Sequence, residues 1–131
     1  MPKIVFCEDS LVAQKLIRAA LKTTRHELHF ALNGSEGLKL IEQVRPNIIF
    51  TDVHMDEMTG LELLAAVKAR EDLSWIPVIL MTASVQSSYL EEGYRNGAAD
   101  HILKPFTVDE LRAKVEKHVS NLFQTIPLSS R

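Results

Sequence analysis

The stretch that decides the fold is IIFTDVHM, residues 48–55, in which a short apolar run ends in an acid. Its first residues are β-favouring, and a run this short and apolar is typical of a strand buried on both faces. The acid is Asp52, at the point where such a strand would reach solvent. The same order of residues occurs in KIVFC, residues 3–7, which is followed by Glu8 and Asp9. Two buried strands that both end in acids indicate a shared role for those acids.

Short apolar runs alternate with segments of helical periodicity along the chain. Val12, Leu16 and Ala20, for example, recur at a spacing of four and predict one face of a helix. The predicted strands cover residues 3–7, 26–32, 47–51, 78–81 and 101–103, and the predicted helices cover residues 11–23, 35–44, 60–70, 85–96 and 108–123. This alternation favours an α/β fold, a doubly wound five-stranded parallel sheet of the form (βα)5 with helices on both faces.

The composition is that of one globular domain. The chain has 131 residues, of which 46% are apolar and 24% charged, with a formal net charge of −2. This charge provides no positive field for direct binding of nucleic acid or of an anionic membrane. No apolar run reaches the ~18 residues of a membrane span, and the N-terminus lacks the apolar segment of a signal peptide. We therefore expect a cytoplasmic protein with neither nucleic acid nor membrane as a direct partner.

Ligands of open α/β sheets bind at the carboxyl ends of the strands. Four of the five predicted strands end there in a side chain capable of chemistry: Glu8 and Asp9 after the first, Asp52 after the third, Thr82 after the fourth and Lys104 after the fifth. Three carboxylates and one ammonium leave about two negative charges, which a hard divalent cation such as Mg²⁺ would neutralise. We expect direct ligation by Asp9 and Asp52, ligation by Glu8 directly or through water, and one backbone carbonyl just past Asp52.

Mg²⁺, a carboxylate, a hydroxyl and a lysine are together typical of phosphoryl transfer. A carboxylate oxygen can attack phosphorus and form an aspartyl-phosphate. We favour Asp52 as the nucleophile because it stands alone on the middle strand, whereas Glu8 and Asp9 form a pair. Each residue alone has an ordinary explanation, such as a turn, a helix cap or a solvated charge. Their joint occurrence at four strand ends favours a common site.

Residues 3 to about 123 resemble a response-regulator receiver domain of two-component signalling, the CheY-like family. The resemblance rests on four motifs in the same order and spacing: FCEDS (6–10), TDVHMDEMTG (51–60), PVILMTA (77–83) and NGAADHILKPF (96–106). It implies a flavodoxin-like sheet with the strand order 2-1-3-4-5. It also implies that residues 1–123 are the receiver domain, and we expect residues 124–131, where the helical pattern is lost, to be a C-terminal tail or linker stub.

The resemblance implies a signalling switch. Asp52 would accept a phosphoryl group from the phosphohistidine of a histidine kinase or a histidine phosphotransfer protein. The protein would be no enzyme acting on a separate substrate, but a phospho-acceptor that catalyses its own phosphorylation and dephosphorylation. The implied roles are Mg²⁺ ligation by Glu8, Asp9, Asp52 and the backbone carbonyl of His54, phosphate stabilisation and switching by Thr82, Lys104 and His101, and flanking of the site by Ala83 and Ser84.

The resemblance also implies how the signal leaves the domain. Phosphorylation would shift the face formed by the fourth helix, fifth strand and fifth helix and so control an unknown protein target or output domain. The same face would be available for homodimerisation. The Lys104–Pro105 bond is expected to be cis. Asp56 departs from the family pattern, which usually has proline there, and is expected to loosen the loop and to add a fourth acid near the metal.

Three other functions are weaker. A nucleotide or flavin module needs a glycine-rich or hydroxyl-rich loop after its first strand, where this chain has the acidic EDSLV of residues 8–12. An aspartyl-phosphate phosphatase would have a D-x-D pair there, not the adjacent Glu8 and Asp9. A receiver-like scaffold that never turns over phosphate would not need the complete set of site side chains, which are Glu8, Asp9, Asp52, Thr82 and Lys104.

Overall fold

The computed structural model describes residues 1–84 and 88–124 of the chain. The elements, in chain order, are β1 (Lys3–Cys7), α1 (Leu11–Ala20), β2 (Glu27–Ala31), α2 (Gly34–Val44), β3 (Ile48–Asp52), α3 (Gly60–Lys68), β4 (Val78–Thr82), α4 (Ser88–Arg95), β5 (Asp100–Leu103) and α5 (Val108–Gln124). The predicted alternation is confirmed. Residues 85–87, the predicted start of the fourth helix, and residues 125–131 of the predicted tail lie outside the described residues.

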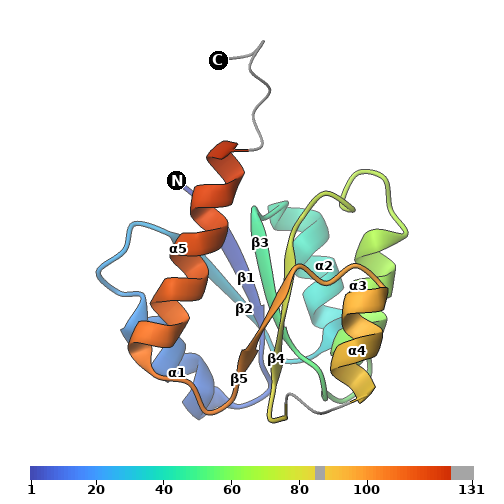
Figure 1. The fold of residues 1–131 in the computed structure, drawn as a ribbon, viewed down its shortest axis with the longest axis horizontal. Helices are drawn as coiled ribbons and strands as arrows, with labels where there is room; N and C mark the ends of the chain where they lie inside the picture. Colours follow the sequence, from blue (N-terminus) through green and yellow to red (C-terminus); the bar gives the residue numbers. More distant parts are fainter. Residues whose placement is uncertain (85–87, 125–131) are drawn as a thin grey trace.

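The five strands form one parallel sheet in the order β2-β1-β3-β4-β5, as the resemblance implied. Figure 1 shows α1 and α5 on one face of the sheet and α2, α3 and α4 on the other. The strand β3 lies between β1 and β4, and all five of its residues are buried. Its continuous apolar sequence is explained by this central position, because both faces of β3 pack against helices.

Alternate residues of the central strands enter two separate cores. Val5 and Ile49 pack in the cluster under α2, α3 and α4. Phe6 and Phe50 pack in the cluster under α1 and α5, with their rings stacked at 4.9 Å between centroids. The register pairs Val5 with Ile49 and Phe6 with Phe50. Strands β1 and β3 therefore end side by side, which brings the acids that follow them to the same edge.

The observed bounds differ from the predicted ones at several ends. The helix α1 stops at Ala20, and the Thr24 hydroxyl then donates a hydrogen bond to the Leu21 carbonyl in a turn. The helix α3 ends at Lys68, whose ammonium donates to the carbonyl oxygens of Ser74 and Ile76 at 2.8 and 3.0 Å. These contacts satisfy the carbonyls of the following turn. The spacing of apolar residues along a helix does not reveal these contacts, so it could not predict where the two helices end.

Within residues 1–84 and 88–124, no helix combines the length and apolar character that crossing a membrane requires.

Candidate functional site

The carboxyl edge of the sheet brings the predicted side chains together. Glu8 and Asp9 follow β1, Asp52 is the last residue of β3, and Lys104 follows β5. The Lys104 Nζ donates hydrogen bonds to Glu8 Oε1 at 2.6 Å and to Asp52 Oδ1 at 2.9 Å. One ammonium therefore joins two carboxylates that belong to different strands. The Lys104–Pro105 peptide bond that follows is cis, as expected.

Glu8 is completely buried and is held from three sides. Its Oε2 accepts a hydrogen bond from the Ser10 backbone N–H at 3.0 Å, while Oε1 accepts from Lys104. The Gln14 side chain donates to the Glu8 backbone carbonyl at 2.8 Å. Gln14 was not among the predicted site residues. The available signal was a polar residue three positions before the buried Ile17, on the same face of α1.

A glycine fixes the position of Asp52 relative to α3. The Gly60 backbone N–H donates to the Val53 carbonyl at 2.9 Å. A Cβ atom at Gly60 would lie 2.0 Å from the Asp52 carbonyl oxygen. Only glycine therefore lets the start of α3 pack this closely against the end of β3. This contact holds the backbone on which the Asp52 carboxylate is carried.

Burial and mutual repulsion set the protonation of the acids. Burial, together with the adjacent Glu8, raises the pKa of Asp52 from 3.8 to about 7, although Lys104 opposes this rise. Burial also acts to raise the pKa of Glu8, but hydrogen bonds with Asp52, Lys104 and Ser10 outweigh it and lower that pKa. Partial burial and the neighbouring Glu8 raise the pKa of Asp9. Two buried carboxylates beside one ammonium thus favour retention of a proton.

The acids form a group that could hold a metal ion. Glu8, Asp9 and Asp52 each offer a carboxylate oxygen, and these oxygens lie within 4.8 Å of one another. Hard divalent cations prefer such oxygen ligands, so the donor set fits Mg²⁺. Both Glu8 oxygens already accept protein hydrogen bonds, which leaves Asp9 and Asp52 as the more available donors. Asp56 is exposed and does not belong to this group.

A cleft of about 180 Å³ opens beside Asp52. It is lined by Asp9, Asp52, Val53, His54, Met81, Thr82, Ala83 and Lys104. The cleft thus contains most of the predicted site residues. Asp52 itself is only 5% exposed, so its carboxylate lies near the floor. A cleft of this size is suited to a small group such as a phosphoryl group and its waters.

Two predicted switch residues, Thr82 and His101, form hydrogen bonds with groups other than the site carboxylates and Lys104. The Thr82 hydroxyl donates to the Ser84 carbonyl at 3.1 Å and accepts from the Ser84 N–H at 3.3 Å. His101 is half-buried on β5, and its Nδ1 is hydrogen-bonded to the Tyr94 hydroxyl of α4. Thr82 therefore borders the cleft while it bonds the loop that follows β4. His101 connects β5 to α4 and is not among the residues that line the cleft.

A second buried charge cluster lies at the start of β5 and was missed in the sequence. Asp100 is buried and accepts from Lys114 at 2.9 Å and from Lys117 at 3.2 Å, and it pairs with His118 at 3.0 Å. Burial acts to raise the pKa of Asp100, but these α5 side chains and a backbone N–H hold it well below its usual range. The lysines and the histidine follow 14 to 18 residues later, so no local spacing reveals the contact.

Known proteins share this sequence pattern. The response regulator receiver domain model matches residues 4–116. The chain is 32% identical over 118 residues to the chemotaxis protein CheY of Listeria monocytogenes, which covers 89% of this chain and 98% of CheY. It is also 32% identical over 115 residues to the regulatory protein AtoC of Escherichia coli, covering 88% of this chain but 24% of AtoC. The chain therefore spans about a quarter of AtoC.

Solved structures agree with the sequence comparison. The receiver domain of a signal transduction histidine kinase from Syntrophus aciditrophicus is similar with a TM-score of 0.86 and 30% identity, covering 98% of this chain and 97% of that one. The Mn²⁺-bound response regulator Rcp1 is similar with a TM-score of 0.78 and 27% identity, covering 98% and 99%. Receiver domains are phosphorylation-dependent switches of two-component signalling. By its sequence, its strand order and its acidic edge, this chain belongs to the response regulator receiver domain family.

Proposed function

We propose that Asp52 is the phosphoacceptor of this receiver domain and that it takes its phosphoryl group from the phosphohistidine of a histidine kinase or a phosphotransfer protein. The observation that carries the proposal is the position of Lys104, which bonds both Glu8 and Asp52 beside the cleft. A fixed ammonium at the attacking carboxylate is suited to stabilise charge on a transferring phosphoryl group.

The transfer step places each residue in a defined role. The deprotonated Asp52 carboxylate attacks phosphorus, the bond from phosphorus to the donor imidazole nitrogen breaks, and that nitrogen keeps the electron pair. Lys104 then pairs with a phosphoryl oxygen, and the receiver itself supplies the catalytic groups for its own phosphorylation and dephosphorylation. Asp9, Asp52, the His54 carbonyl and Glu8, directly or through water, would hold Mg²⁺, which supplies charge neutralisation when bound. The Mn²⁺ in the related Rcp1 supports a divalent cation here.

The phosphoryl group would act on the rest of the domain through Thr82. Its hydroxyl, which now bonds the Ser84 backbone, would turn to a phosphoryl oxygen. The Lys104 backbone N–H, just after β5, donates to the Thr82 carbonyl at 2.7 Å, and side chains join β5 to both neighbouring helices of the face formed by α4, β5 and α5. The Tyr94–His101 hydrogen bond joins α4 to β5, and Asp100 joins β5 to α5. These contacts give a route by which a shift at Thr82 repositions the face that contacts a target, an output domain or a second copy.

An exposed apolar surface beside the site suits the phosphodonor. Leu11, Val12 and Leu16 of α1 are all more than half exposed. An adjacent cleft of about 330 Å³ is lined by α1, by the segment from Pro105 to Val108 and by Lys104. A protein that brings a histidine to Asp52 has to cover this edge, and an apolar helix on that protein would bury these side chains.

We further propose that residues 1–123 form the receiver domain, that residues 124–131 serve as its tail or linker, and that the domain works in the cytoplasm. Helix α5 includes Gln124, one residue past the proposed end of the domain. The near-neutral charge of −2 supports a protein partner over a direct nucleic acid or membrane partner.

The test is the intact mass of the purified protein after incubation with Mg²⁺ and acetyl phosphate or phosphoramidate. We expect the wild type and an Asp56→Asn control to gain one phosphoryl group, and an Asp52→Asn variant to gain none. Omission of Mg²⁺ should abolish the gain. If no gain occurs in folded wild-type protein with either donor, the domain is a scaffold that does not turn over phosphate.

A further inference from the structure

Two tyrosines of α4 each contact a histidine edge-on. Tyr89 and His54 have ring centroids 4.8 Å apart at an interplanar angle of 86°, and Tyr94 and His101 have centroids 5.7 Å apart at 89°. The two pairs differ in place. His54 lines the Asp52 cleft, whereas His101 does not. Only the first pair therefore connects α4 to the mouth of the candidate site.

His54 stands at the rim of the cleft. Asp52 is almost fully buried, so a phosphoryl group on its carboxylate would face solvent through the cleft. The exposed lining residues that the structure describes are Asp9, His54 and Ala83, and of these three only His54 carries a ring. An exposed histidine ring without packing partners samples several rotamers. Contact with an aromatic edge favours one of them.

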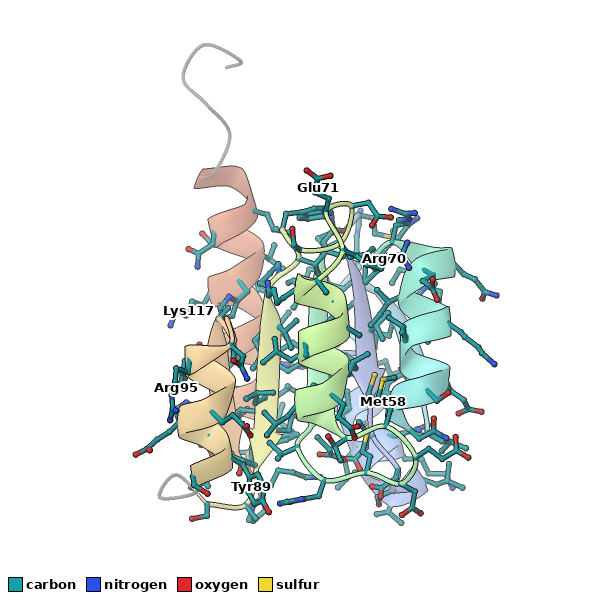
Figure 2. All side chains as sticks on the ribbon, turned by 90° about the vertical axis from the view of Figure 1, so that its right-hand side faces the viewer. Met58, Arg70, Glu71, Tyr89, Arg95 and Lys117 are labelled. Carbon is teal, nitrogen blue, oxygen red and sulfur yellow. The ribbon has the colours of Figure 1, made fainter. Side chains whose placement is uncertain are left out.

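Tyr89 supplies this contact from another part of the chain. It lies in the first turn of α4 and is 47% exposed, so one part of its ring is packed and another faces solvent. Figure 2 shows Tyr89 at the edge of the molecule where the loop from β3 to α3 also lies, opposite to the edge that carries Glu71. The contact with Tyr89 therefore joins the His54 ring to α4.

We propose that Tyr89 is a positioning residue that holds the His54 ring at the mouth of the Asp52 cleft and so slows hydrolysis of the aspartyl-phosphate. The inference rests on the proposed role of Asp52 as phosphoacceptor. In hydrolysis, a water oxygen bonds to phosphorus, the bond from phosphorus to the Asp52 oxygen breaks, and the carboxylate keeps that electron pair. The water gives up a proton to solvent, and inorganic phosphate leaves. Because attacking and leaving oxygens must be roughly in line, a ring at the mouth obstructs the approach of water.

The experiment measures how long the phosphoryl group persists. Wild type and variants are phosphorylated with phosphoramidate and Mg²⁺, freed of donor, and followed by intact mass over time in the presence of Mg²⁺. We expect Tyr89→Ala and His54→Ala to lose phosphate about 2- to 10-fold faster, the range that an aromatic edge contact provides. Tyr89→Phe keeps an aromatic ring and should retain the wild-type rate. Glu92→Ala, at an exposed position of α4, is the control.

A double variant separates positioning from a general effect on the fold. If Tyr89 acts through His54, the combined Tyr89→Ala and His54→Ala protein should lose phosphate no faster than His54→Ala alone. Additive rates, an unchanged rate in Tyr89→Ala, or slower loss would overturn the inference. Because phosphorylation is scored before decay, absence of any mass gain would overturn the proposed function as well. Normal gain with unchanged decay would overturn this inference alone.

Discussion

Replacing Asp52 with asparagine should stabilise the metal-free protein at alkaline pH. The wild type buries Asp52 beside the buried Glu8, with Lys104 as the shared cation. Raising a carboxyl pKa from 3.8 to about 7 corresponds to about 4 kcal/mol against the charged form. The same contacts lower the pKa of Glu8, so they stabilise its charged form and offset part of the cost of charging Asp52. We therefore expect Asp52→Asn to raise the free energy of unfolding by about 2 kcal/mol.

The pH dependence of this gain follows from the protons that each state binds. An aspartate in the unfolded chain has a pKa of about 3.9, so between about pH 4 and pH 7 folded Asp52 binds more protons than unfolded Asp52. The contribution of Asp52 to the free energy of unfolding of the wild type therefore falls as pH rises through that window. Asparagine carries no such proton. The stability difference between variant and wild type should be small near pH 4 and complete above about pH 7.

Urea unfolding followed by circular dichroism, with EDTA present, measures this difference at pH 4.5 and pH 8. Asp56→Asn is the matched control, because it removes an acid from the loop that follows Asp52 but outside the buried group. An Asp52→Asn protein no more stable than wild type at pH 8 would show that the ion pair with Lys104 outweighs the burial of charge. An equal gain at both pH values would show that the effect is not electrostatic.

Three further predictions concern residues around the site. Mg²⁺ should raise the thermal unfolding midpoint of the wild type, and Asp9→Asn should remove most of this rise; a full rise in the variant would exclude Asp9 as a ligand. Gly60→Ala should lower the free energy of unfolding in urea by about 1–3 kcal/mol, because its Cβ would lie 2.0 Å from a backbone oxygen; an unchanged value would contradict the close packing. Asp100→Asn should lower stability by about 1–3 kcal/mol at pH 7. Because the pKa of Asp100 is low in the folded protein, its contribution to the free energy of unfolding is complete above about pH 4 and is lost as pH falls further. The urea unfolding curves of the two proteins should therefore converge in acid. Curves that stayed apart in acid would refute this account.

The sequence by itself determined the type of fold and the main side chains that gather at one edge of the sheet. Alternating strand and helix patterns are local properties of the chain, and they require parallel strands that all end at one edge. The acids after residues 3–7, Asp52, Thr82 and Lys104 could therefore be placed together from the sequence. The order of the strands could not be derived in this way, because alternation is compatible with several orders, and it came from the resemblance to a known family.

Only the tertiary structure decided how these residues act on one another. The bonds from Lys104 to Glu8 and Asp52 join positions 96 and 52 residues apart, and the high pKa of Asp52 depends on burial by neighbouring elements. The contact of Tyr89 with His54 likewise depends on where α4 packs. Periodicity describes a residue's own helix or strand. Charge state, hydrogen-bond partner and ring contact depend on atoms brought close by folding, and no spacing along the chain encodes them.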